Sequence, residues 1–501
     1  MLRKVIFCKR KIPYILLTLI IFNMMMPIGR VFGQVVAGSG WSEPTNLSNT
    51  IASSSSPEIV ADNFGMVHVF WIEDLYGEPH IIGSAPRYGN AIMYRSFYDG
   101  EWSPTVDIVY TGELGRINAL SAVVDRNGVL HLVWNQGDEL HYSNVSAWKA
   151  GQVNEWSEPY RISSEGVTQV HISDNTNGVI VICSRSRGDE SGLFAVQISD
   201  DGSISNIPIW SAPRESLPRD IAVAVDGRGR LHVVWSLINL PDIEPTEVYY
   251  SRSEDNGNTW SEHELIAHEA PEGNLLRFAV PWVAARGNDE IHLQWAQGPL
   301  PYRWHRYSID GGVSWTQSYQ IWPKLHSQSN SRAIGVDGDG VLHWIDLLRY
   351  PNGGFHTYWQ ENGWRFPQLI YLMQQDPWDE LGERINAHRF RLAISQGNQL
   401  HVMFQDQDRA EIWTMNRTLS SSAHEPDPKP EFILLPTPEE VIHGNSEITN
   451  TDFILNTQNN NIDITQKDQV IESNPGNILV LGTIPVILII AVIFVRKKIV
   501  K

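Results

Sequence analysis

Residues 128–134 read Gly-Val-Leu-His-Leu-Val-Trp, and variants of this string return along the chain. The clearest are Gly-Met-Val-His-Val-Phe-Trp at 65–71 and Gly-Arg-Leu-His-Val-Val-Trp at 229–235. Shorter copies follow at 291–295, 341–344 and 400–404, and a copy without histidine stands at 178–183. A spacing of about 50 to 60 residues suits one four-stranded blade of a β-propeller. The sequence therefore predicts an all-β propeller of about seven blades, or six if 178–183 is only an insertion.

The residues around these copies also favour short, doubly buried strands. Each copy is a nearly continuous apolar run, which is typical of strands whose two faces are both covered. Turn-forming strings such as Asp-Arg-Asn-Gly at 125–128 and Asp-Gly-Asp-Gly at 337–340 separate the runs. Because blades of a propeller pack face to face, this pattern fits a propeller better than an open sheet with one wet face.

The two ends of the repeat array predict how the ring closes. The last repeat, from His388 to about Leu419, offers three strands and lacks the Trp-Ser strand that usually ends a repeat. That strand appears near the other end, as Gly-Trp-Ser-Glu-Pro at 40–44. Borrowing it would complete the last blade and remove the exposed edges of a linear array.

Composition excludes some classes of function. The net charge of −19 leaves no basic surplus for a nucleic-acid partner. Two cysteines, Cys8 and Cys183, cannot build a disulfide framework, and Cys183 lies in an apolar run, where we expect a buried thiol. We expect a monomeric domain that is held by packing and closure and has no cofactor.

Segments outside the repeats predict a surface-anchored protein. Residues 1–34 combine basic residues with an apolar stretch and read as a signal peptide, with retention as an anchor as the alternative. The propeller is expected at 35–419 and a disordered Pro- and Asn-rich stalk at 420–477. An uncharged run at 478–495 predicts a transmembrane helix, and the basic tail at 496–501 predicts a cytoplasmic C-terminus. The propeller would then be extracellular on a single-pass cell-membrane protein.

Histidine recurs in one register in six of the copies. Metal ligands must converge on one ion, whereas residues used once per blade are spread around a ring. We therefore expect these histidines to pack between blades or to satisfy neighbouring backbone groups, and we predict no metal site.

Two stretches, 253–260 and 308–315, match Ser-x-Asp-x-Gly-x-(Thr/Ser)-Trp. This pattern resembles the Asp-box of the sialidase-like, BNR-repeat propellers, over about residues 40 to 419. The chemistry of the box is that of a hairpin turn, in which Asp and Ser side chains bond the backbone and Gly adopts a positive φ. In that family the box lies on the face away from the active site, so the resemblance implies a structural role here for Ser253, Asp255, Gly257, Trp260, Ser308, Asp310, Gly312 and Trp315.

The resemblance also implies a kind of chemistry. Sialidases resemble one another in three arginines that grip a carboxylate, an Asp acid/base, and a Tyr nucleophile activated by a Glu. The Phe/Tyr-Arg-Ile-Pro string that usually carries the first arginine does not occur in this chain; the strings at 115–118 and 383–386 lack the proline.

Arginines nevertheless stand at or just before the first strand of several predicted blades. First strands are innermost in a propeller and begin on the face where ligands bind, so these guanidinium groups could converge on a carboxylate or sulfate. The solvated-surface alternative is that they are simply exposed. The candidate binding residues are Arg116, Arg219, Arg277, Arg332 and Arg389, the last accompanied by Arg391. Loops after the second strands reach the same face, and there Asp74 and Glu73 are the candidate acids.

Three functions follow as hypotheses. The first is a membrane-anchored propeller that binds a glycan or another anionic ligand, such as one with a carboxylate, at the channel mouth. The second is an exo-glycosidase resembling sialidases, with Asp74 or Glu73 as acid/base. The third is a structural or adhesion module for protein contacts. The sequence alone leaves open whether the protein is an enzyme.

Overall fold

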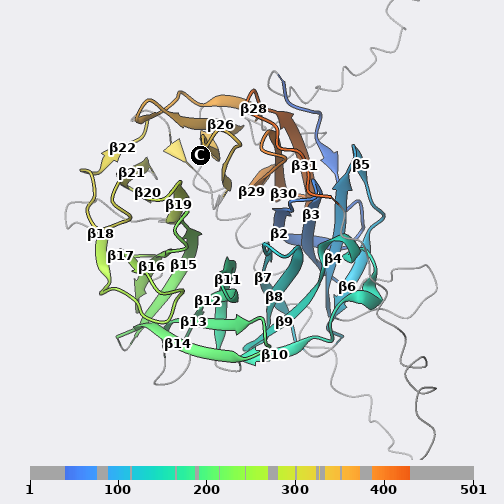
Figure 1. Ribbon diagram of the computed structural model, residues 1–501, viewed down its shortest axis with the longest axis horizontal. Coiled ribbons are helices and arrows are strands. Elements are labelled where there is room, and N and C mark those ends of the chain that lie inside the picture. The colour runs from blue at the N-terminus through green and yellow to red at the C-terminus, as the bar shows by residue number, and fades with distance from the viewer. Residues whose placement is uncertain are drawn as a thin grey trace, which may run out of the picture. The chain divides into compact units, whose positions relative to one another are not determined.

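The computed structural model describes residues 40–75, 89–112, 115–163, 166–186, 191–213, 215–242, 244–268, 280–298, 302–322, 326–327, 333–349, 353–372 and 386–428. These residues form seven antiparallel sheets arranged as the blades of one wheel (Figure 1). The prediction of seven blades is therefore confirmed, and the six-bladed alternative is wrong. The copy at 178–183 forms the second strand of the third blade, despite having no histidine.

The strands of each blade are given below in order from the central channel outward. Blade 1 contains β2 (Ser53–Ala61), β3 (Val67–Asp74), β4 (Asn90–Tyr98), β5 (Glu101–Trp102) and β6 (Val106–Tyr110). Blade 2 contains β7 (Ile117–Val124), β8 (Val129–Gln136), β9 (Glu139–Ser146) and β10 (Tyr160–Ser163), with 3-10 helices η1 (Ala147–Lys149) and η2 (Val153–Glu155) before β10. Blade 3 contains β11 (Val167–Asn175), β12 (Gly178–Arg185), β13 (Gly192–Ser199) and β14 (Ile204–Ser211).

The remaining four blades follow the same order. Blade 4 contains β15 (Ser216–Val225), β16 (Leu231–Asn239), β17 (Glu247–Ser253) and β18 (Glu264–His268). Blade 5 contains β19 (Trp282–Arg286), β20 (Glu290–Gln297), β21 (Tyr302–Ser308) and β22 (Tyr319–Gln320). Blade 6 contains β23 (His326–Ser327), β24 (Ala333–Val336), β25 (Leu342–Arg349), β26 (Gly353–Gln360), β27 (Gly363–Trp364) and β28 (Gln368–Leu372). Blade 7 contains β29 (Ala387–Ser395), β30 (Gln399–Asp406), β31 (Glu411–Thr418) and, outermost, β1 (Thr45–Asn46).

The N-terminal segment closes the ring, as the sequence predicts, but with a shifted strand. β1 pairs with β31 through Thr45 opposite Thr414, so the paired strand begins just after the predicted residues 40–44. Within those residues Ser42 bonds Asn416 in both directions at 2.9 Å. Trp41 is buried in an apolar cluster that blades 6 and 7 share. Residues 40–44 thus contact the last blade before the paired strand begins. The β1–β31 ladder follows at Thr45 and Asn46.

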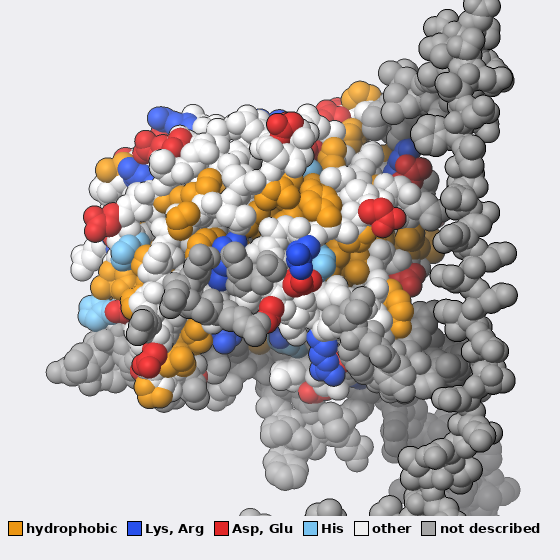
Figure 2. Space-filling view, turned by 90° about the horizontal axis from the view of Figure 1, so that it is seen from below, with side chains coloured by type: hydrophobic (Ala, Val, Ile, Leu, Met, Phe, Trp, Pro, Cys, Tyr) orange, Lys and Arg blue, Asp and Glu red, His pale blue; other side chains and the backbone are white. Residues whose placement is uncertain are grey.

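Apolar packing between neighbouring blades makes the core. Phe70 of blade 1 and Leu132 of blade 2 belong to one buried cluster, and Ile182 of blade 3 and Trp235 of blade 4 to another. Cys183 is a buried thiol, as expected. Seen from the edge of the wheel, hydrophobic side chains gather near the middle of the wall while charged groups are scattered over it (Figure 2).

The recurring histidines are structural, and their partners are mostly side chains. In blade 1, the ring of His68 lies 2.8 Å from the Tyr94 hydroxyl and 3.2 Å from an Asp62 carboxylate oxygen. The Asp62 carboxylate also accepts the amides of Phe64 and Met66, so it holds both the turn and the histidine. The same arrangement recurs at Asp125, His131 and Tyr142 in blade 2, and at Asp226, His232 and Tyr250 in blade 4.

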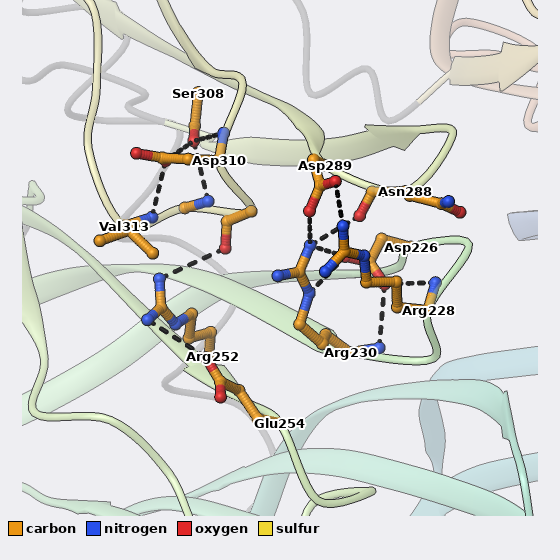
Figure 3. Close-up of polar contacts among 12 residues, drawn as sticks. Asp226, Arg228, Arg230, Arg252, Glu254, Asn288, Asp289, Ser308, Asp310 and Val313 are labelled. Atoms are coloured by element: carbon orange, nitrogen blue, oxygen red, sulfur yellow. Dashed lines mark hydrogen bonds and ion pairs between the residues drawn. The ribbon is translucent and has the colours of Figure 1, made fainter.

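Ion pairs join a turn of blade 4 to a turn of blade 5 (Figure 3). Both turns lie on the face opposite the one where the first strand of each blade begins. The Asp289 carboxylate of blade 5 accepts Arg228 at 2.6 Å and Arg230 at 2.8 Å. Arg230 also donates to Asp226 at 2.7 Å. Burial opposes ionisation of Asp226, but hydrogen bonds from His232 and Arg230 outweigh it and hold its pKa at about 2. The Asp226 carboxylate therefore stays ionised across the physiological range.

The two Asp-box stretches form closed hairpin turns on that same face. Ser308 donates to Asp310 at 2.7 Å and accepts the Gly312 amide at 2.8 Å. Asp310 also accepts the Ser314 amide at 2.9 Å, and Gly312 has a φ of 82°. In blade 4 the corresponding bonds join Ser253, Asp255, Gly257 and Thr259. The indoles of Trp260 and Trp315 donate to the Gly257 carbonyl and to Glu264.

No helix among the described residues has the length and hydropathy of a membrane span. The predicted signal peptide at 1–34, the transmembrane helix at 478–495 and the basic tail at 496–501 lie outside those residues, as does most of the predicted stalk.

Candidate functional site at the channel mouth

The innermost strands carry one-residue bulges near the level where they begin. Five of them show the shift: β2, β7, β11, β15 and β29. In three of the five the bulge holds a non-glycine residue in the left-handed region: Ser56 at φ 53°, Asp220 at φ 51° and Arg389 at φ 52°. Such conformations are costly and persist where surrounding structure enforces them, often beside binding sites.

These bulges surround a cavity of about 190 Å³ at the mouth of the channel. Its walls come from five inner strands, which Figure 1 shows around the centre of the wheel. The lining residues are Ser56, Pro57, Asn118, Ala119, Leu120, Thr168, Gln169, Val170, Asp220, Arg389 and Arg391. Two guanidinium groups, one carboxylate, two amides and two hydroxyls therefore meet in one small polar cavity.

The two arginines differ in how firmly they are held. Arg391 donates through Nε to Glu58 at 3.3 Å and through Nη1 to the Phe390 carbonyl at 3.0 Å. Among the described residues, the Arg389 guanidinium makes one hydrogen bond, a 3.4 Å contact to Gln405. Burial, and then the charge of Arg391, lower the pKa of Arg389. Because the charge of Arg391 disfavours the charged form of Arg389, an anion bound beside Arg389 would relieve this repulsion.

Below the mouth, the channel continues as a cavity of about 310 Å³ that all seven innermost strands line. Glu58 is the acid within it. Burial raises the pKa of Glu58, while the charge of Arg391 and a hydrogen bond from Ser121 oppose that rise. Asp220 stands at the mouth itself and accepts the Ser236 hydroxyl at 3.0 Å.

The structure brings only part of the predicted arginine set together. Arg389 lines the mouth cavity with its neighbour Arg391. Arg116 and Arg219 are exposed and are not among the lining residues. Arg277 and Arg332 lie outside the described residues. The sequence does not predict the other polar residues of the mouth cavity, above all Asp220. The bulges direct these residues into the cavity.

The two predicted acids lie elsewhere. Glu73 is buried and accepts the Thr50 hydroxyl at 3.0 Å and the Trp71 indole at 3.3 Å. It lines a separate cavity of about 550 Å³ beside the ring-closing segment. Asp74 ends β3 and lines neither cavity. Neither acid shares the mouth cavity with Arg389. No cluster of three metal-ligating side chains occurs in the part of the chain that the structure covers.

Comparison with known proteins gives likeness of fold. No family model and no curated protein matches the chain. Among solved structures, a protein of unknown function from Dyadobacter fermentans is 13% identical, with TM-score 0.46, over 76% of this chain and 100% of that one. The NanB sialidase from Streptococcus pneumoniae is 12% identical, with TM-score 0.41, over 76% of this chain and 70% of that one. An α-L-arabinanase from Penicillium chrysogenum is 13% identical, with TM-score 0.41, over 75% and 99%.

Proposed function

We propose that the protein binds an anionic glycan, or another ligand with a carboxylate, at the mouth of its channel. The observation that carries the proposal is the pairing of Arg389 and Arg391 in one partly buried polar cavity. The cavity is smaller than the ~300 to 1,000 Å³ pockets of drug-sized ligands, so it suits one terminal residue of a longer chain. Asn118, Gln169 and Thr168 would bond its hydroxyls.

Arg389→Ala tests the proposal on an array of acidic and neutral glycans. Removing a guanidinium that grips a carboxylate should weaken binding to acidic glycans by about 2 kcal/mol, or roughly thirtyfold. The matched control is Arg126→Ala, which removes an exposed arginine from a turn on the opposite face, where it pairs with Asp174. Absence of binding to any acidic glycan, or equal binding by the two variants, would overturn the proposal and leave a scaffold for protein contacts.

Hydrolysis is the second candidate function, and Asp220 is the observation that favours it. Its carboxylate lines the same cavity as the two arginines, on a backbone held in the left-handed region. An acid so placed could donate a proton to a glycosidic oxygen. An aryl-glycoside panel decides between the functions: Asp220→Asn should remove turnover but keep binding if the protein is a hydrolase. A lack of turnover on every substrate would leave binding alone.

We also propose that the propeller is displayed on the cell surface. Support comes from the apolar run at 478–495 with its basic flank. A chain stopped before residue 478 should appear in the culture medium, whereas the full chain should stay with the membrane fraction. Equal fractionation of the two chains would contradict the anchor.

A further inference from the structure

A second polar cavity, of about 480 Å³, lies at the seam between blades 6 and 7. It is formed by the turn before β25, by β25, β26 and β28, and by the end of β31 with the segment that follows. These elements place it on the face opposite the channel mouth. Its lining residues are Asp337, Asp339, Val341, His343, His356, Tyr358, Gln360, Gln368, Arg417, Thr418, Leu419, Ser420 and Ser421.

A chain of hydrogen bonds leads into this cavity and stops there. Asp337 Oδ2 lies 3.1 Å from His343 Nε2, and His343 Nδ1 lies 2.8 Å from His356 Nε2. A carboxylate can only accept, so His343 carries its proton on Nε2 and its Nδ1 is an acceptor. His356 must then donate from Nε2, and its Nδ1 keeps a free lone pair. That Nδ1 is buried and has no hydrogen-bond partner among the described residues.

Blade 5 contains the same chain with one more member. Glu290 bonds His292 at 2.9 Å, and His292 Nδ1 lies 3.0 Å from His305 Nε2. The chain then ends on the Tyr319 hydroxyl, 2.9 Å from His305 Nδ1. His305 pairs with Tyr319 across the outer strands of blade 5, and His356 pairs with Gln368 at the same place in blade 6. Gln368 does not supply the hydrogen bond to His356 Nδ1 that the tyrosine hydroxyl supplies to His305 in blade 5.

Blade 7 shows that an unpartnered imidazole nitrogen does not by itself open a cavity. His401 Nδ1 is also buried without a partner among the described residues. An aromatic ring packs against each imidazole, Phe97 against His401 at 5.5 Å and Trp41 against His356 at 5.8 Å, but His401 lines none of the cavities described above. The blade 6 arrangement therefore differs in having both the acceptor and the space beside it.

We infer that the cavity at the seam of blades 6 and 7 binds a neutral polyhydroxylated ligand, such as a sugar, which donates one hydroxyl to His356 Nδ1. The ligand hydroxyl would occupy the place that the Tyr319 hydroxyl has in blade 5. Burying an acceptor without a donor is costly, so a donor that fits is strongly favoured.

The rest of the lining matches such a ligand better than an ion. Arg417 contacts Gln368 at 3.4 Å and lies over the Trp41 ring, and Asp337 is engaged by His343 and by turn amides. Asp339, the second carboxylate of the lining, accepts the Ser422 amide at 3.2 Å, so each charged side chain of the lining already has a polar or aromatic neighbour. Side-chain amides and hydroxyls, which suit ring hydroxyls, supply most of the remaining polar groups. Burial and the charges of His343 and Arg417 lower the pKa of His356 to about 3, so its lone pair persists at neutral pH.

Saturation-transfer NMR on the full chain, with a panel of methyl glycosides of common hexoses, tests the inference. At least one member should receive saturation from the wild-type protein. Gln368→Tyr, which reproduces blade 5, should abolish that transfer because the new hydroxyl takes the acceptor and fills the space. Arg126→Ala, which removes an exposed arginine that pairs with Asp174 in a turn of blade 2, should leave it unchanged.

A second variant keeps the test decisive if Gln368→Tyr does not fold, as judged by near-ultraviolet circular dichroism. Gln360→Trp changes an exposed residue at the rim of the cavity and should block entry without touching the histidines. Transfer that survives the folded cavity variants would overturn the inference. Absence of transfer to every glycoside would do the same, and would mean that water alone occupies the position.

Discussion

Blades 5 and 6 are built on the same pair of stacked histidines, yet one is complete and the other is open. Both pairs have ring centroids about 5 Å apart, at 5.2 Å in blade 5 and 5.1 Å in blade 6. Blade 5 ends its hydrogen-bond chain on Tyr319, whereas blade 6 has Gln368 and a cavity. The comparison shows that two repeats can share the same packing and still differ in hydrogen bonding. One residue on the outer strand determines whether the buried histidine has a donor within its own blade.

Acid should unfold the protein, and this is the largest effect we expect. Burial lowers the pKa of His292, His305, His343 and His356, so these rings stay neutral when folded and take protons only when unfolded. Their contribution is fully present above the unfolded value near 6.5 and is lost as pH falls through the lowered folded values, which for His356 is about 3. Each such proton costs about 1.4 kcal/mol per pH unit. Melting temperature measured from pH 8 to pH 5 should therefore fall steeply.

His356→Tyr is the matched variant for that titration. Blades 1, 2 and 4 carry tyrosine at this third-strand position, bonded to their histidines. The variant should fold and should flatten the acid slope by about one proton. A slope identical to that of the wild type would show that the histidine pair does not carry the pH dependence.

Removing one hydroxyl should make blade 5 resemble blade 6. Tyr319→Phe leaves His305 Nδ1 buried without a donor, which should lower the free energy of unfolding by about 1 to 3 kcal/mol. Urea titration measures the change. A loss below about 0.5 kcal/mol would mean that water replaces the hydroxyl readily, and that the two blades differ less than their structures suggest.

The reverse exchange should have the opposite sign and a smaller size. Gln368→Tyr in blade 6 adds the missing donor, so the free energy of unfolding should rise by about 0.5 to 1.5 kcal/mol. The same urea titration applies, with Gln360→Trp as a control that fills space without reaching the acceptor. A destabilised Gln368→Tyr would indicate that the blade 6 seam cannot accept an aromatic ring.

The smallest expected difference concerns the outer turns of the two blades. Asp310 of blade 5 accepts bonds from Ser308, Val313 and Ser314, whereas Glu361 of blade 6 makes an exposed ion pair with Arg365. Asp310→Ala should cost about 1 kcal/mol, and Glu361→Ala should stay within about 0.5 kcal/mol of wild type. Equal costs would show that the Asp-box aspartate of blade 5 stabilises its turn no more than Glu361 stabilises the corresponding turn of blade 6.

The sequence predicts the wheel well because the signal is repeated. Apolar strings return at the spacing of a blade, so even the string around Cys183, without a histidine, is placed correctly by its neighbours. The Asp–His pairs could also have been predicted, since Asp62, Asp125, Asp226 and Asp337 each stand six residues before a repeat histidine. Repetition makes such spacings visible.

The mouth could be predicted only in part, because a bulge moves side chains to places that strand alternation does not foresee. Arg389, whose own backbone is in the left-handed region, reaches the cavity. Arg219 stands just before the corresponding residue of blade 4 and is exposed. The sequence does not predict Asp220 as a site residue either, because its place also depends on a bulge. The role of Gln368 required the register of β26 against β28, which no short string reveals.

The pairing of Thr45 with Thr414 has a consequence for biosynthesis. The ribosome synthesises the first partner of this pair hundreds of residues before the second. The wheel therefore cannot close until nearly the whole domain has been translated. Contacts this distant in the chain slow folding and leave β-strand edges open meanwhile. We therefore expect the nascent protein to depend on chaperones until its last blade emerges.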